Sequence, residues 1–153
     1  MKKLLSVLMV MFMVAMAGSA LASGTNTLTV SASVTGTCKF VSGTSTLNFG
    51  ALDPSSSSDA TGSGSTTFWC TKGTTQTLAA GNGANWDGTK RNILDAVSSD
   101  KIPYTLTLTP DGGTNAGPGS PRTVTIGGTI LNADYVSKSA GSYSDTVTLN
   151  ITP

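Results

Sequence analysis

Alternation of apolar and polar residues at both ends of the chain, broken only by Asp145, limits most strongly what this sequence can fold into. Residues 27–34 read TLTVSASV, and residues 143–152 read YSDTVTLNIT. A period of two residues is typical of a β-strand with one buried face, whereas an amphipathic helix needs a period near 3.6. Both ends of the chain are therefore predicted to be strands.

The chain between these ends is a series of short β-type runs separated by turn residues. Residues 53–65 and 110–121 are rich in Ser, Gly, Asp and Pro and are predicted to be loops. Residues 81–100 are predicted to be a long excursion with one helical turn at 93–97. Strands are expected at 38–41, 46–49, 66–71, 75–80, 102–109, 122–130 and 142–152. Short strands with polar turns, and no long helical stripe, predict an all-β sandwich.

Residues 1–22 have the pattern of an export signal. Two lysines open the segment, an apolar run covers residues 4–16, and small residues close it at 20–22. The alternative is a membrane anchor, but the apolar run is shorter than the about 20 residues that a span requires. We therefore expect cleavage after Ala22, export through the periplasm, and a mature chain at 23–153 without membrane insertion.

The composition argues against several classes of function. The sequence contains no His and no Glu, so Ser-His-Asp and Cys-His catalytic arrangements are excluded. Without Lys2 and Lys3, seven Lys and Arg stand against eight Asp, which gives a net charge of −1. Such a balance offers no electrostatic attraction to nucleic acid or anionic membranes. We expect neither an enzyme nor a bound cofactor or metal.

A few motifs have a functional and a structural interpretation. Residues 111–115, DGGTN, would suit a calcium loop or a plain turn, and turns are the usual place of Asp beside Gly. Residues 150–152 form a glycosylation triplet inside a strand pattern, where a solvent-facing Asn explains them equally. Trp69 and Trp86 are ligand platforms or structural anchors. None of these motifs identifies a chemistry.

Two cysteines, Cys38 and Cys70, remain in the mature chain. An even number of cysteines in an exported protein indicates a disulfide. The alternatives are two free thiols or a metal pair, although a zinc site would need further His or Cys ligands that the sequence lacks.

The final strand has no hairpin partner after it in the sequence. The opening strand at 27–34 is a candidate partner, because the hinge at 35–37, Thr-Gly-Thr, is flexible enough to let it point away from its own domain. This strand either pairs within its own domain or is offered to another molecule.

Several short motifs occur together in a fixed order. After the opening strand come Cys38, TLNFG at 46–50, CTKG at 70–73 and GSYSDTVTLNI at 141–151. With this combination the chain resembles the spore coat protein U-type domain found in subunits of archaic chaperone–usher pili. The resemblance covers essentially the whole of 23–153.

The resemblance implies an incomplete immunoglobulin-like sandwich that lacks its last strand. In this family a periplasmic chaperone lends a strand to the open groove, and an outer-membrane usher exchanges it for the N-terminal strand of the next subunit. By position, residues 23–36 match the donor strand and hinge, and residues 37–153 match the pilin domain. Cys38 and Cys70 match the family disulfide. The groove-filling donor side chains would be Leu28, Val30, Ala32 and Val34, and the acceptor groove would be lined by Val147, Leu149 and Ile151.

The function implied by the resemblance is that of a structural subunit of an extracellular pilus on the cell surface. Head-to-tail strand exchange would give a homopolymer that serves adhesion or biofilm formation. Ala32 is small for a groove-filling side chain, so one pocket is expected to be shallow. Two alternatives stay open: a secreted monomeric binding module whose opening strand folds back, and a coat protein of resting cells.

Overall fold

The computed structural model describes residues 23–153, so the expected export signal lies outside the described residues. Residues 23–33 and residues 34–153 form separate units, and each is described by itself. The first unit contains neither strand nor helix. In the described part of the chain there is no helix that is long and apolar enough to span a membrane.

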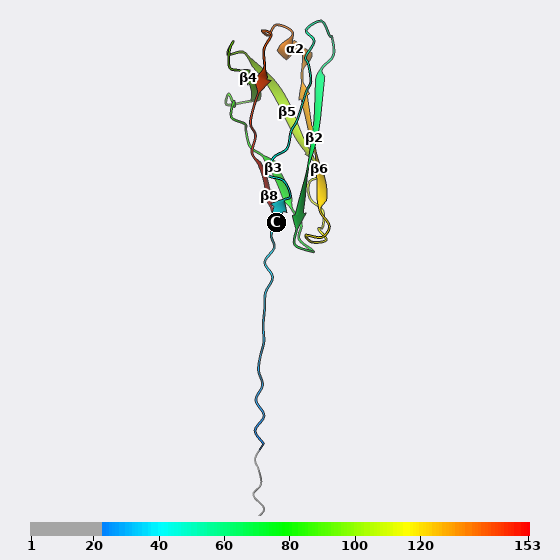
Figure 1. The fold of residues 1–153 in the computed structure, drawn as a ribbon, viewed down its shortest axis with the longest axis vertical. Coiled ribbons are helices and arrows are strands. Elements are labelled where there is room, and N and C mark those ends of the chain that lie inside the picture. The colour runs from blue at the N-terminus through cyan, green and yellow to red at the C-terminus, as the bar shows by residue number, and fades with distance from the viewer. Residues whose placement is uncertain (1–22) are drawn as a thin grey trace, which may run out of the picture. The chain divides into compact units, whose positions relative to one another are not determined.

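The second unit consists of two antiparallel sheets (Figure 1). The six-stranded sheet has the order β1-β2-β6-β5-β4-β7, and the two-stranded sheet pairs β3 with β8. Its single described helix is α2, Asn132–Tyr135. The strands are β1 Cys38–Phe40, β2 Ala60–Cys70, β3 Thr77–Ala80, β4 Arg91–Asp95, β5 Lys101–Thr109, β6 Arg122–Ile130, β7 Tyr143–Ser144 and β8 Leu149–Thr152. The predicted all-β fold is confirmed.

The strand order matches an immunoglobulin-like sandwich with one position unfilled. Constant-type immunoglobulin domains place strands A, B, E and D in one sheet and C, F and G in the other. Here β1-β2-β6-β5 corresponds to A-B-E-D, and β3-β8 corresponds to C-F. No strand among residues 23–153 occupies the position of G, next to β8.

The core between the sheets has two parts. One cluster contains Phe68, Cys70, Leu78 and Val124, and Ile151 packs against it. The other cluster contains Ile102, Tyr104, Ile130 and Tyr135. All eight of the clustered side chains are buried, so both clusters contribute the hydrophobic free energy that holds the sheets together.

A disulfide joins the first two strands. Cys38 lies directly opposite Cys70 in the β1–β2 register, and their sulfur atoms are bonded. The bond closes a loop with a sequence separation of 32. A loop of this size stabilises the folded state by about 3–4 kcal/mol through the lost entropy of the unfolded chain. The predicted disulfide is confirmed.

The structure corrects several expected elements. The loop predicted at 53–65 is wrong from residue 60 onward, because Ala60–Ser65 are paired with Thr125–Ile130 as the first half of β2. The helical turn predicted at 93–97 is wrong as well, since β4 pairs with β5 and β7 there. Only a single bridge, Asn48 to Ser63, forms in the strand expected at 46–49. The last expected strand is divided into β7 and β8.

Glycine residues explain why the sequence of the first half of β2 is typical of a loop. The backbone of residues 46–48 lies against this half of the strand, where a side chain would not fit. A Cβ atom on Gly62 would lie 2.7 Å from the Asn48 carbonyl oxygen, and one on Gly64 would overlap the Thr46 carbonyl oxygen. The strand is therefore made of residues that pack backbone to backbone and carry no hydrophobic signal.

Replacing Gly64 with Ala is expected to destabilise the domain by about 2–3 kcal/mol, because its Cβ displaces the crossing segment at 46–48. Chemical denaturation followed by tryptophan fluorescence measures the loss. Gly43→Ala is the matched control, since nothing lies within 4 Å of its added Cβ. Equal stability of the two variants would contradict the close crossing.

Candidate functional site

A groove of about 640 Å³ opens between the edges of the two sheets. One rim is the segment at 45–52, and the other rim is the segment at 143–149. Core side chains of β5 and β6 form its floor. Its apolar lining includes Leu47, Phe49, Tyr104, Leu106, Val147 and Leu149. The groove thus exposes part of the core where a further strand would close a complete sandwich.

Main-chain groups at the groove are left without strand partners. β8 pairs with β3 on one edge, and no strand within residues 23–153 pairs with its other edge. β1 is likewise the edge strand of the larger sheet. An open strand edge beside an apolar groove is a template for another extended chain, because its unpaired backbone N–H and C=O groups can hydrogen-bond to that chain.

The expected acceptor residues lie in two places. Val147 and Leu149 line the groove. Ile151 packs against the cluster around Phe68, where the two sheets are closed. All three are half-buried and alternate with exposed residues, as the period-2 pattern indicated.

The expected donor residues are solvent-exposed in this chain. Leu28 is 82% exposed, Val30 is 83% exposed and Val34 is 86% exposed. Ala32 is exposed as well, and the whole segment at 27–34 is free of strand pairing. Three large apolar side chains of this segment are therefore exposed to water on one face of the alternating pattern.

The rim at 143–149 is held by the Asp145 carboxylate. Its Oδ2 accepts a hydrogen bond of 2.8 Å from the Tyr104 hydroxyl, and its Oδ1 accepts bonds from the backbone and side-chain nitrogens of Asn85 at 3.1 and 3.2 Å. Gly83, with φ +88°, leaves room for the carboxylate, since a Cβ there would collide with Oδ2. Asp145 therefore ties the rim to β5 and to the loop after β3.

Gly141 and Tyr143 of the same motif lie beside Asp95. Asp95 is 3% exposed, and hydrogen bonds from the Ser98 hydroxyl and backbone hold the pKa of its carboxyl below the ordinary value. Tyr143 lies opposite Asp95 in the β4–β7 register, and a Cβ on Gly141 would lie 2.7 Å from its carboxylate. Sequence reasoning assigned most Asp residues to turns and missed these positioning roles, although G-x-Y-x-D stood out as a motif.

The hinge after the donor segment is anchored to the sandwich. The Thr37 backbone N–H donates to the Thr71 hydroxyl at 3.0 Å, and the Thr71 backbone N–H donates to the Thr37 carbonyl at 2.8 Å. The Thr71 hydroxyl also lies 3.4 Å from the Thr35 carbonyl. The chain therefore leaves the sandwich from a fixed point at the end of β2.

The sequence pattern of one family covers nearly all of this unit. The Spore Coat Protein U domain matches residues 24–150. The chain belongs to the Spore Coat Protein U domain family. Its motifs fall at the groove: TLNFG forms one rim, and G-x-Y-x-D-T-V forms the other.

A comparison with solved structures finds one from archaic chaperone–usher Csu pili of Acinetobacter baumannii. It is the CsuC–CsuE chaperone–tip adhesion subunit pre-assembly complex, with a TM-score of 0.49 and 18% sequence identity. The match covers 77% of this chain and 40% of that chain. The present chain thus spans less than half the length of its counterpart. No curated protein matches the sequence.

The groove combines an apolar lining with a neighbouring strand edge. Leu149 of β8 lines it, and β8 has a strand partner on one side only among residues 23–153. Within the described part of the chain no group of three or more His, Cys, Asp or Glu side chains is placed to hold a metal ion.

Tyr104→Phe is expected to destabilise the domain by about 2 kcal/mol, because it removes a hydrogen bond to a charged carboxylate. Burial, followed by the bond to Asp145, raises the pKa of Tyr104 above its ordinary value. The neutral phenol therefore stabilises the fold below about pH 10, and this stability is lost as the pH rises and the unfolded chain ionises first.

Urea denaturation between pH 8 and pH 11 measures both effects. Wild type is expected to lose stability above about pH 10, and Tyr104→Phe is expected to show a flatter profile. Tyr135→Phe is the control, because its hydroxyl donates to the neutral Ser58 carbonyl. An equally steep loss of stability with pH in Tyr104→Phe would contradict a stabilising role for the hydrogen bond from Tyr104 to Asp145.

Proposed function

We propose that this protein is a structural subunit of an extracellular chaperone–usher pilus, assembled by strand exchange between neighbouring subunits. The observation that carries the proposal is the groove beside the unpaired edge of β8, in a chain that also exposes an unpaired apolar segment at 27–34. Each copy then supplies both an acceptor and a donor.

The donor segment suits the groove in its pattern, because its apolar side chains alternate with polar ones. As a strand, its eight residues at 27–34 extend over about 26 Å. Burying Leu28, Val30 and Val34 would each contribute about 1.5–3 kcal/mol, and Ala32 would contribute less. Val147 and Leu149 are proposed to contact the donor in the groove, with Ile151 supporting it from the closed core.

A contact of this kind joins the head of one subunit to the tail of the next. Heterologous contacts that do not close into a ring produce open filaments. A subunit with an empty groove would aggregate, so a periplasmic chaperone is needed until an outer-membrane usher completes the exchange. Membership in the Spore Coat Protein U domain family supports this route. Adhesion or biofilm formation is the proposed role of the fibre.

The test is gel migration of the exported protein in SDS without heating, with the native secretion genes present. Wild type is expected to give a ladder of multimers that collapses to monomer on boiling. Val30→Lys is expected to remove the ladder, because it would bury an unpaired charge in the groove. Thr29→Lys, on the opposite face of the same segment, is the matched control and should keep the ladder.

A ladder lost equally in both variants would contradict binding of one face in the groove. A folded monomer that persists with its secretion genes would overturn the proposal. The opening strand would then pair within its own domain, as in a secreted binding module.

A further inference from the structure

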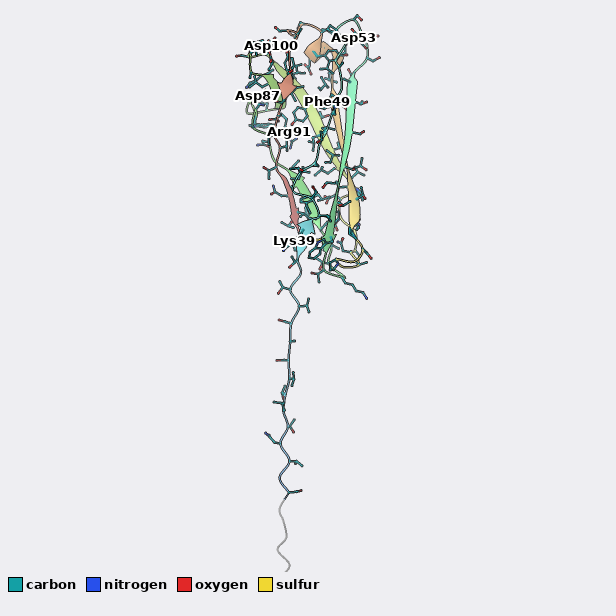
Figure 2. All side chains as sticks on the ribbon, viewed as in Figure 1. Lys39, Phe49, Asp53, Asp87, Arg91 and Asp100 are labelled. Carbon is teal, nitrogen blue, oxygen red and sulfur yellow. A yellow bond between two sulfur atoms is a disulfide. The ribbon has the colours of Figure 1, made fainter. Side chains whose placement is uncertain are left out.

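One end of the sandwich is rich in carboxylates. Asp53 and Asp100 both lie at this end in Figure 2. Asp59 belongs to the same region, where its carboxylate accepts a hydrogen bond of 2.8 Å from the backbone of Asn132 at the start of α2. Asp100 accepts a bond of 2.9 Å from the Ser139 backbone, and Ser139 lines the groove. The acidic end, defined by Asp53, Asp59 and Asp100, therefore lies next to groove residue Ser139, and its cations are Lys101 and Lys138, the second of which lines the groove.

The opposite end carries exposed lysines. Figure 2 shows Lys39 at this end, on β1. Lys72 follows Thr71, the residue that anchors the hinge, and is also exposed. The other charges nearby are engaged within the domain: Arg122 stacks on Phe68 at 5.5 Å, and Asp111 accepts the Leu78 backbone N–H at 2.8 Å. The basic end is defined by Lys39 and Lys72.

The direction of an inserted strand follows from the topology. Both sheets are antiparallel, so a strand in the position of G runs opposite to β8. β8 ends next to the hinge of its own subunit, since a Cβ on Gly36 would lie 3.7 Å from the Pro153 side chain. The donor segment of a neighbouring subunit therefore runs from the hinge end of the groove toward Ser139. It leaves the groove at the acidic end.

The hinge is too short to separate the two subunits. Only residues 35–37 stand between Val34 of the donor and the disulfide-bonded Cys38, and three extended residues span at most about 11 Å. The hinge is bonded to Thr71, beside Lys72. The basic end of the donor subunit is thus brought against the acidic end of the acceptor.

We propose that Lys39 and Lys72 of one subunit form a second interface with Asp53, Asp59 and Asp100 of the next, alongside the exchanged strand. This inference rests on the proposed strand exchange. The charges lie at the rim of the contact, where opposite charges orient the partners and make the contact dependent on salt. The interface fixes the angle between successive subunits, which a strand on a hinge would otherwise leave free.

The experiment is carbodiimide cross-linking of intact fibres, followed by mass spectrometry of the peptides. This reagent joins a lysine amine to a carboxylate only where the two groups touch. A link from Lys39 or Lys72 to an acidic-end carboxylate must join two subunits, because the two ends lie at opposite ends of one sandwich. A link between Lys138 and Asp100 is the internal control, since the Asp100 carboxylate accepts a hydrogen bond from the backbone of Ser139, the residue next to Lys138.

We expect wild-type fibres to yield such links, and 1 M salt, with a Debye length of about 3 Å, to reduce them. The double variant Lys39→Gln and Lys72→Gln should keep its SDS-resistant ladder, which separates strand exchange from the second interface, and it serves as the blank for the links because it lacks both amines. Lys90→Gln, which removes an exposed lysine in the loop between β3 and β4, should retain the links.

Two results would overturn the inference. An intact ladder without these links would leave strand exchange standing and contradict the second interface alone. The second interface is also contradicted if Lys90→Gln lowers the yield of these links as much as the double variant does. Loss of the ladder in wild type would instead contradict the proposed function on which this inference depends.

Discussion

The unpaired edge of β8 is the constraint on which the rest of this structure depends. A sandwich needs apolar cover over its whole core, yet here the second sheet has only two strands among the described residues. The cluster around Phe68 is closed by β3 and β8, whereas the cluster around Tyr104 opens into the groove. Both clusters are buried and stabilise the domain, and the disulfide adds to the closed half, whereas the half around Tyr104 borders the groove.

Polar side chains keep the groove open without a strand in it. The rim at 143–149 would be free to fall onto the exposed core if only hydrophobic contacts held it. Asp145 prevents this by accepting bonds from Tyr104 and from Asn85, which lie on two different elements. A half-buried carboxylate with several donors fixes a geometry more narrowly than apolar contacts do, because hydrogen bonds are directional. The rim of the groove is thus held in place by bonds within the chain itself.

Sequence reasoning predicted the sandwich, the disulfide and the C-terminal strand β8, because each depends on a local pattern or a simple pairing rule. The strand predicted at 27–34 is wrong for the single chain, since that segment has no strand pairing there. Sequence reasoning also failed at β2 and β4, where the reason for the strand lies elsewhere in the chain. Residues 60–65 are Gly- and Ser-rich because the backbone at 46–48 crosses them. The role of Asp145 depends on Tyr104 and Asn85, which are far away in sequence, so no periodicity could indicate it.

The position of the disulfide has a mechanical consequence for a fibre of the proposed kind. Tension along such a fibre would enter each domain through the hinge and reach Cys38 first. β1 is a three-residue edge strand whose few hydrogen bonds would otherwise break one after another. The bond to Cys70 passes the load covalently to β2, which is held along its length by β6. A pull on the domain therefore shears a long strand in the middle of a sheet instead of peeling a short one from its edge.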